Sequence, residues 1–287
     1  MKEKETYCGF VSIIGKTNVG KSTLLNRLIG KKISITSSKS QTTLCNIVGI
    51  LTKKNKQIIY IDTPGMKNKN FIFKKYHFFE NKYFYKNSLI IFVIEEMIWD
   101  HNDERLLKSL RFSSCPILLV VNKIDKVSDK KYFLPYLSFL RKKMNFLNII
   151  LVSAKKNQFI GEINKLIFNL IPREKLFFSK EKITNSSKKF IISEIIREKT
   201  IRYLGDELPY LINIKIKNSI FNKEHFRISA FIYVNKKSQK KIIIGNQGKK
   251  IKKISMCSRI DIQKYFLIKS SLYLWVKINK KIKFKKF

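Results

Sequence analysis

An eight-residue stretch near the start of the chain has the residue types and the spacing of a phosphate-binding loop. It matches the pattern G-x-x-x-x-G-K-[ST] and consists of Gly15, Lys16, Thr17, Asn18, Val19, Gly20, Lys21 and Ser22. Successive backbone N–H groups of such a loop point into one concavity, and the following helix adds its positive end. Lys21 would reach the β- and γ-phosphates, and the Ser22 hydroxyl would bind Mg²⁺. For an isolated match, the alternative is a plain glycine turn.

Three further motifs, each at the end of an apolar run, favour the nucleotide interpretation. They are Asp62, Thr63, Pro64 and Gly65; Asn122, Lys123, Ile124 and Asp125; and Ser153 and Ala154. The Asp62 carboxylate can hold Mg²⁺ through water, and the Gly65 amide can sense a γ-phosphate. Asp125 can accept hydrogen bonds from guanine N1–H and the exocyclic amine, a donor pair that adenine lacks. The Ala154 N–H can meet guanine O6. Four motifs in this order predict a GTP-binding domain.

A threonine pair lies between the first predicted helix and the second predicted strand. One of Thr42 and Thr43 should contact Mg²⁺ when the γ-phosphate is present, and Thr43 is favoured because it lies nearer the next strand. An ordinary polar loop is the alternative. The expected catalytic groups are thus Lys21, Thr43 and Gly65, and the expected Mg²⁺ ligands are Ser22, Thr43 and Asp62.

Predicted strands and helices alternate over the first 170 residues. This alternation is what would place the motifs together at one edge of a sheet. Apolar runs typical of strands occur at 10–15, 46–52, 57–62, 88–96, 115–122 and 148–154, and helical patterns at 21–30, 103–112, 133–144 and 159–171. This alternation predicts an α/β fold with a mostly parallel sheet covered by helices on both faces. The motifs lie at the carboxyl ends of strands, where open α/β sheets bind ligands.

The remainder of the chain has a different pattern. We expect a GTP-binding domain over residues 1–172, a charged, Ser-rich linker over 173–190 and a second domain over 191–287. The second domain begins with a helical pattern that Gly205 ends, and alternating runs at 211–217 and 226–235 predict antiparallel strands. A glycine-containing turn, another helical pattern and a final strand complete an α+β module.

The net charge of +40 permits two explanations. A basic surface attracts nucleic acid or anionic lipid. A genome rich in A and T would also enrich lysine throughout, and the chain has 51 Lys but only 9 Arg. The excess is denser in the second part: residues 173–287 carry +22, and residues 1–172 carry +18. The second part is therefore the better candidate for a polyanion-binding surface.

Other bulk features indicate a protein of the reducing cytosol. The four cysteines are scattered without a C-x-x-C pair, no apolar run has membrane-spanning length, and the N-terminus has no apolar signal core.

Taken together, the motifs resemble those of the Era GTPases, bacterial proteins of ribosome assembly. The resemblance rests on residues 15–43, the DTPGM run that ends at Met66, the NKID and VSA motifs, and the stretches 193–210 and 240–254, and it covers nearly the whole chain. It implies a P-loop GTPase domain followed by a type II KH domain, with GTP or GDP and Mg²⁺ bound. It also implies binding to the 3′ end of 16S ribosomal RNA and to the immature 30S subunit. Such proteins are cytoplasmic and associate peripherally with the inner membrane, and we expect a monomer.

The KH resemblance assigns a GXXG loop to Gly245, Asn246, Gln247 and Gly248. Such a loop joins two helices and lets the RNA backbone approach closely. Four basic residues follow at once and can neutralise phosphates, namely Lys249, Lys250, Lys252 and Lys253. A plain turn with solvated lysines is the alternative that the loop alone would favour.

Two departures and one further similarity bear on the resemblance. Met66 follows the DTPG motif where Ras-like enzymes have a glutamine, so we expect slow intrinsic hydrolysis. Asn18 is similar to an asparagine that coordinates K⁺ in some relatives, and a simple polar loop residue is the alternative. The chain ends at KIKFKKF, so we expect it to lack the short tail that usually follows in this family. A rival hypothesis is a non-hydrolysing basic RNA-binding or peripheral membrane protein with a degenerate GTPase domain.

Overall fold

The computed structural model describes residues 5–35, 46–63, 87–204 and 212–279. The described chain forms two compact units. One contains the residues up to Ser34 and those from 46 to Asn185, and the other contains Ile35 and the residues from Ser186 onward.

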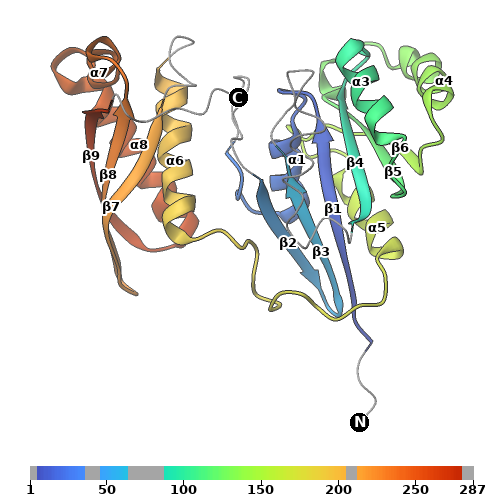
Figure 1. The fold of residues 1–287 in the computed structure, drawn as a ribbon, viewed down its shortest axis with the longest axis horizontal. Coiled ribbons are helices and arrows are strands. Elements are labelled where there is room, and N and C mark those ends of the chain that lie inside the picture. Colours follow the sequence, from blue (N-terminus) through green and yellow to red (C-terminus); the bar gives the residue numbers. More distant parts are fainter. Residues whose placement is uncertain (1–4, 36–45, 64–86, 205–211, 280–287) are drawn as a thin grey trace. The chain divides into compact units, whose positions relative to one another are not determined.

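The first unit is built on a six-stranded sheet (Figure 1). Its strands are β1 (Tyr7–Gly15), β2 (Ile47–Lys53), β3 (Lys56–Asp62), β4 (Asn87–Glu95), β5 (Ile117–Asn122) and β6 (Asn148–Leu151), in the spatial order β2-β3-β1-β4-β5-β6. β2 pairs with β3 in antiparallel fashion, and every other neighbouring pair is parallel. The prediction of a mostly parallel sheet is confirmed.

Helices cover both faces of this sheet (Figure 1). They are α1 (Lys21–Ile29), α3 (His101–Leu110), α4 (Phe133–Lys143) and α5 (Ile160–Leu170). Helices α1 and α5 contact each other and β3, whereas α3 and α4 bury leucines against β4 and β5. The strands between the two helical layers are almost entirely apolar, as expected for a parallel sheet buried on both faces.

Helix α3 begins two residues before the start that its periodicity predicts. The Asp100 side chain accepts hydrogen bonds from the backbone N–H groups of Asn102 and Asp103, and the Asp103 carboxylate accepts from the Asp100 N–H. This reciprocal capping satisfies donors that a helix start otherwise leaves unpaired.

Residues 173–185, assigned to a linker from sequence, lie against the first unit, and α6 (Lys188–Tyr203) already begins the second. The buried Gln57 side chain connects this segment to the sheet. Its Oε1 accepts from the backbone N–H groups of Phe177 and Phe178 at 3.0 and 2.9 Å, and its Nε2 donates to the Phe178 carbonyl at 2.9 Å. Burial makes these bonds costly to break, which fixes the segment in place.

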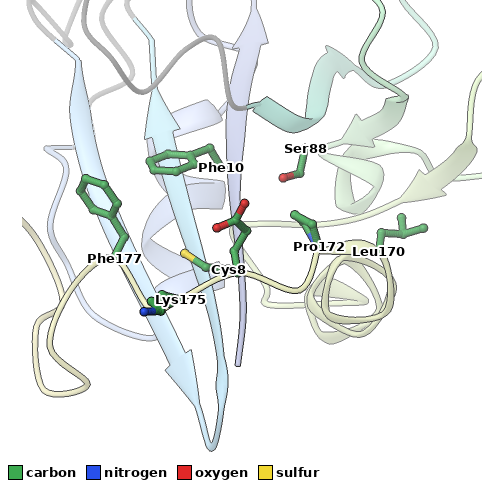
Figure 2. A pocket seen from close by; sticks show the side chains of 8 residues that line it. Cys8, Phe10, Ser88, Leu170, Pro172, Lys175 and Phe177 are labelled. Atoms are coloured by element: carbon green, nitrogen blue, oxygen red, sulfur yellow. The ribbon is translucent and has the colours of Figure 1, made fainter. Parts of the chain in front are cut away.

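A cavity of about 410 Å³ lies where this segment passes the beginnings of β1 and β4 (Figure 2). Its lining comprises Cys8, Phe10, Ser88, Leu170, Pro172, Glu174, Lys175 and Phe177. Strand β1 runs from Tyr7 to Gly15, so the cavity lies at the opposite end of β1 from the predicted phosphate loop.

The second unit is a three-stranded mixed sheet with helices on one face. Its elements after α6 are β7 (Asn213–Phe221), β8 (His225–Val234), α7 (Lys237–Ile244), the 3₁₀ turn η6 (Asn246–Gly248), α8 (Lys249–Phe266) and β9 (Lys269–Ile278). Strand β8 lies in the middle, antiparallel to β7 and parallel to β9. The α+β prediction is confirmed. Helix α6 begins at Lys188 because the Ser187 hydroxyl caps it, five residues earlier than predicted.

Among the residues described, no helix combines the length and the apolar character needed to cross a bilayer.

Candidate nucleotide and nucleic-acid sites

The predicted phosphate loop joins the end of β1 to the beginning of α1. Gly20 caps α1 in a left-handed conformation, with φ of 97°. A Cβ atom at this position would lie 2.3 Å from Asn122 Nδ2, which is closer than side chains approach. The loop therefore needs glycine here both for its backbone angle and for its contact with the next motif.

Lys21 and Asp62 form a buried pair at this end of the sheet. The Lys21 ammonium donates to the carbonyls of Gly15 at 3.0 Å and Lys16 at 2.5 Å. Burial lowers the pKa of Lys21 to about 8, and attraction to Asp62 opposes this shift. Burial also raises the pKa of Asp62, against the opposing effects of Lys21 and of hydroxyl hydrogen bonds. The loop therefore holds its ammonium inward, at the position from which it can meet a phosphate.

The surroundings of Asp62 fit a divalent cation. The Ser22 hydroxyl donates to Asp62 Oδ2 at 2.7 Å, and the Ser34 hydroxyl donates to the same oxygen at 3.1 Å. The second oxygen, Oδ1, is buried and has no hydrogen-bond partner among the described residues. Hydroxyl and carboxylate oxygens are the ligands that Mg²⁺ prefers. Ser22 and Asp62 are thus adjacent, with one carboxylate oxygen uncommitted.

The motifs predicted to recognise the base converge on the loop from β5 and from the end of β6. Asn122 Nδ2 donates to the Val19 carbonyl at 2.7 Å, and the Ala154 N–H donates to Asn122 Oδ1 at 2.9 Å. The Ser153 hydroxyl donates to Asp125 at 2.5 Å, and this bond lowers the pKa of the Asp125 carboxyl. The lowered pKa favours the ionised carboxylate, the form that can accept from two donors.

The other predicted residues of this site are placed as follows. The Thr63 hydroxyl donates to the Ile13 carbonyl at 2.8 Å, and the Ile124 N–H donates to the Val152 carbonyl at 3.2 Å. Lys123 pairs with Glu95 at 2.6 Å. Asn18 is exposed and has a left-handed backbone, with φ of 66°. Thr17 is half-buried. Thr43, Pro64, Gly65 and Met66 lie outside the described residues.

Two supports of this site were absent from the sequence-based predictions. Lys16 pairs with Asp100 at 2.8 Å and with the fully buried Asp103 at 2.7 Å, which ties the loop to the start of α3. Arg27 of α1 donates to the carbonyls of Ala154 and Lys155 at 3.0 and 3.1 Å. The D-x-x-D pattern at Asp100 was the sequence signal available for the Lys16 ion pairs. No local sequence pattern indicates the hydrogen bonds of Arg27.

The predicted GXXG loop lies in the second unit, between α7 and α8. Gly245 has φ of 71°, and a Cβ atom there would lie 2.6 Å from the Lys250 Cβ. Asn246 and Gln247 are exposed at the tip, and Gly248 caps α8 in a left-handed conformation. Of the four predicted lysines, Lys249, Lys252 and Lys253 are exposed and Lys250 is half-buried. The first turn of α8 has no acidic residue, so basic side chains and the positive helix end coincide.

Comparisons with known proteins agree with both halves of the chain. The family model described as 50S ribosome-binding GTPase matches residues 10–123, and the KH domain model matches residues 207–286. The chain is 47% identical to GTPase Era of Buchnera aphidicola subsp. Acyrthosiphon pisum, covering 96% of this chain and 99% of that protein. It is 42% identical to GTPase Era of Yersinia enterocolitica, covering 96% and 92%.

Two solved structures match the chain over almost its full length. One is Era in complex with MgGDPNP and nucleotides 1506–1542 of 16S ribosomal RNA, with a TM-score of 0.88, 31% identity and coverage of 98% of this chain and 96% of that one. The other is a variant of Aquifex aeolicus Era bound to GDP.AlF4⁻, with a TM-score of 0.89, 30% identity and coverage of 98% and 97%.

The lowered pKa of Lys21 predicts that binding of Mg–GTP weakens above pH 8. Below this pKa of about 8 the amine is already an ammonium. Above it, bound phosphate must draw a proton onto Lys21, so affinity should fall by up to about tenfold per pH unit. Titration calorimetry from pH 7 to 9.5, in two buffers of different ionisation enthalpy, measures both the affinity and the proton uptake.

Two matched variants test whether Lys21 is the group that takes up the proton. Lys21→Arg stays charged over this range and should bind without proton uptake. Lys31→Arg changes an exposed lysine just beyond the same helix and should keep the wild-type profile. Constant affinity with no proton uptake in the wild type would contradict the assignment.

Proposed function

The chain belongs to the Era family of GTPases, and we propose that its nucleotide state controls how firmly its KH domain holds 16S ribosomal RNA during small-subunit assembly. The chain is a GTP hydrolase that uses GTP, GDP and Mg²⁺. One observation carries the proposal. The solved relative Era, which matches 98% of this chain, holds a GTP analogue and a 16S fragment in the same structure.

At the nucleotide, each described motif has a separate task. Backbone N–H groups of the loop and the Lys21 ammonium bind the phosphates. Ser22 and Asp62 hold magnesium, which neutralises phosphate charge when bound. Asp125 selects guanine, and Asn122 fixes the phosphate loop against the base-recognition segment. In this proposal the Ala154 N–H donates both to guanine O6 and to Asn122 Oδ1, as a bifurcated hydrogen bond.

Two groups outside the described residues complete the switch. We assign Thr43 to the magnesium contact and the Gly65 amide to the γ-phosphate, so both segments respond to hydrolysis. With Met66 after the DTPG motif, water is oriented by some group other than a glutamine at this position, and intrinsic turnover is slow.

In the KH domain, the GXXG loop admits the RNA backbone and the lysines that open α8 neutralise its phosphates. The solved relative Era binds a fragment of 16S ribosomal RNA, which supports a cytoplasmic location for this chain. The small ribosomal subunit is a partner in this proposal through its 16S ribosomal RNA. The charge of +40 supports a weaker, peripheral association with the inner membrane.

The GXXG loop should decide the affinity for RNA. Gly245→Asp with Gly248→Asp introduces a clash against Lys250 and two negative charges, so affinity for an RNA with the 3′ sequence of 16S should fall by about tenfold or more. Fluorescence anisotropy in 150 mM salt measures it, with GDPNP or GDP bound. The GDPNP form should bind at least about fivefold more tightly, a modest allosteric coupling.

Gly161→Asp is the matched control because a Cβ at Gly161, in the first turn of α5, meets nothing within 4 Å. It should bind RNA as the wild type does. Equal RNA affinity with GDPNP and GDP would contradict the proposed switch.

Base selection should depend on Asp125. In the variant Asp125→Asn the amide presents a donor where guanine also presents one, so GTP should bind at least about 100-fold more weakly. Xanthosine triphosphate offers an acceptor there and should become the preferred nucleotide. Competition against a fluorescent nucleotide measures both affinities, and Asp129→Asn, on an exposed residue four positions later, is the control. Unchanged guanine preference would refute the role of Asp125.

The two interpretations of Asn18 differ in their dependence on K⁺. As a K⁺ ligand, Asn18 should make hydrolysis faster in 150 mM KCl than in 150 mM NaCl, and Asn18→Ala should remove this difference. As a simple polar loop residue, it should leave the two rates equal. Phosphate-release assays at matched ionic strength decide between them, with Asn157→Ala, another left-handed exposed asparagine, as the control.

A further inference from the structure

The sheet of the KH domain has a face that its helices do not cover. Alternate residues of β8, namely Phe226, Ile228, Ala230, Ile232 and Val234, are buried against α6, α7 and α8. The residues between them point to the other side of the sheet. All five basic residues of the three strands lie on that outer side and are exposed: Lys215, Lys217, Arg227, Lys269 and Lys277. None of the three strands contains an aspartate or glutamate.

Four aromatic rings occupy the centre of this outer face. They are Phe231 and Tyr233 of β8 and Tyr273 and Trp275 of β9, and Phe231 lies directly opposite Trp275 in the register. Tyr273 and Trp275 stack at 6.3 Å with an angle of 25° between their planes, and they are 51% and 46% exposed. Phe231 contacts both Trp275 and Tyr233 edge to face. A soluble strand ordinarily places polar residues at such positions.

Lysines surround the rings. The ammonium of Lys277 lies 4.1 Å from the centre of the Phe231 ring, and that of Lys217 lies 5.6 Å from it. Lys215 is opposite Phe231 in the pairing of β7 with β8. Rings that neighbours hold in place lose little freedom when a flat partner stacks on them, and the lysines supply charge for a backbone of phosphates.

We propose that this outer face, defined by Phe231, Tyr233, Tyr273, Trp275 and the surrounding basic residues, is a second surface for single-stranded RNA. Bases stack on the exposed rings of Tyr273 and Trp275, while Lys215, Lys217 and Lys277 pair with phosphates. The inference rests on the proposed function only in taking RNA as the partner. The GXXG loop belongs to the helical layer, so the two surfaces lie on opposite sides of the sheet.

The composition of the face favours RNA over an anionic membrane. Membrane-inserting surfaces use protruding aliphatic and aromatic residues to reach the acyl region. Ile220 is the one aliphatic residue among the outward positions of β7, β8 and β9, and the remaining apolar residues there are flat rings packed against one another. Rings of this kind, presented on a sheet, match the stacking of unpaired bases.

The test uses the full chain and a 20-nucleotide RNA of repeated adenine–cytosine units, which forms no hairpin. Affinity is measured by fluorescence anisotropy for the wild type, Gly245→Asp/Gly248→Asp, Tyr273→Ala/Trp275→Ala and the combination of the last two. In the background without a working GXXG loop, loss of the two rings should weaken binding by about fivefold or more, since stacking on one aromatic ring is worth roughly that factor or more per base.

Two variants separate stacking from damage to the fold. Tyr273→Phe/Trp275→Phe keeps both ring faces and should bind as its parent does. Lys215→Gln/Lys217→Gln keeps all four rings and should reduce the salt dependence of log K by about 0.7 per lysine. As a remote control, Tyr132→Ala/Lys130→Gln/Lys131→Gln removes one exposed ring and two exposed lysines from the GTPase domain and should leave RNA affinity unchanged.

The protein has only two tryptophans, which provides a second readout. In Trp99→Phe, Trp275 is the one remaining tryptophan, and RNA should quench its emission.

Each result has a definite meaning. Equal affinities of the Ala pair and its parent, with no quenching of Trp275, overturn the second surface. The proposed function survives that result if the GXXG variant has lost the 16S sequence. Weakened binding to phosphatidylserine vesicles in the Ala pair, with RNA affinity unchanged, assigns the face to membranes and also overturns the inference. If the wild type binds neither the RNA with the 16S sequence nor the adenine–cytosine RNA, both the proposed function and the second surface are contradicted.

Discussion

The burial of two opposite charges at one edge of the sheet is the constraint on which the rest of the GTPase domain depends. Lys21 is 6% exposed and Asp62 is fully buried. Removing both from water is costly unless polar groups replace the lost hydration. Loop carbonyls do this for the ammonium, and the Ser22 and Ser34 hydroxyls do it for one carboxylate oxygen. The other carboxylate oxygen is left over. Such an edge suits a ligand that itself combines negative phosphates with a divalent cation.

Parallel pairing brings the parts of this edge together. Ile13 of β1 lies beside Asp62 of β3, so the predicted phosphate loop and the proposed magnesium ligand lie at neighbouring levels of the sheet. Asn122 ends β5 at the level of Glu95 in β4 and reaches across to the Val19 carbonyl. The same side chain accepts from the Ala154 N–H, so Asn122 joins the phosphate loop to the segment at 153–154. One edge of the sheet thus presents all the described nucleotide motifs.

Local sequence patterns predicted much of the nucleotide site and of the GXXG turn. The phosphate loop, the NKID motif and the GXXG turn are short and need particular residue types at fixed spacing, so the sequence alone indicated them. Long-range supports escaped detection. Lys16 with Asp103, Arg27 with Ala154, and Gln57 with the segment at 177–178 join residues 87, 127 and about 120 positions apart. Nothing in a lysine, an arginine or a glutamine identifies such a partner. The Gln57 contacts also explain why part of the predicted linker packs on the first unit.

A biased amino-acid composition does not explain the aromatic residues on the outer face of the KH domain. A bias toward A- and T-rich codons supplies lysine, phenylalanine and tyrosine throughout a chain, and alternation along a strand places lysine outward whatever its role. Alternation would equally place phenylalanine and tryptophan inward, against the helices. Phe231 and Trp275 instead share the outer side with Tyr233 and Tyr273, opposite an already complete apolar core. The exposed rings of Tyr273 and Trp275 carry a cost in solubility, so a ligand that covers them accounts for their position better than drift does.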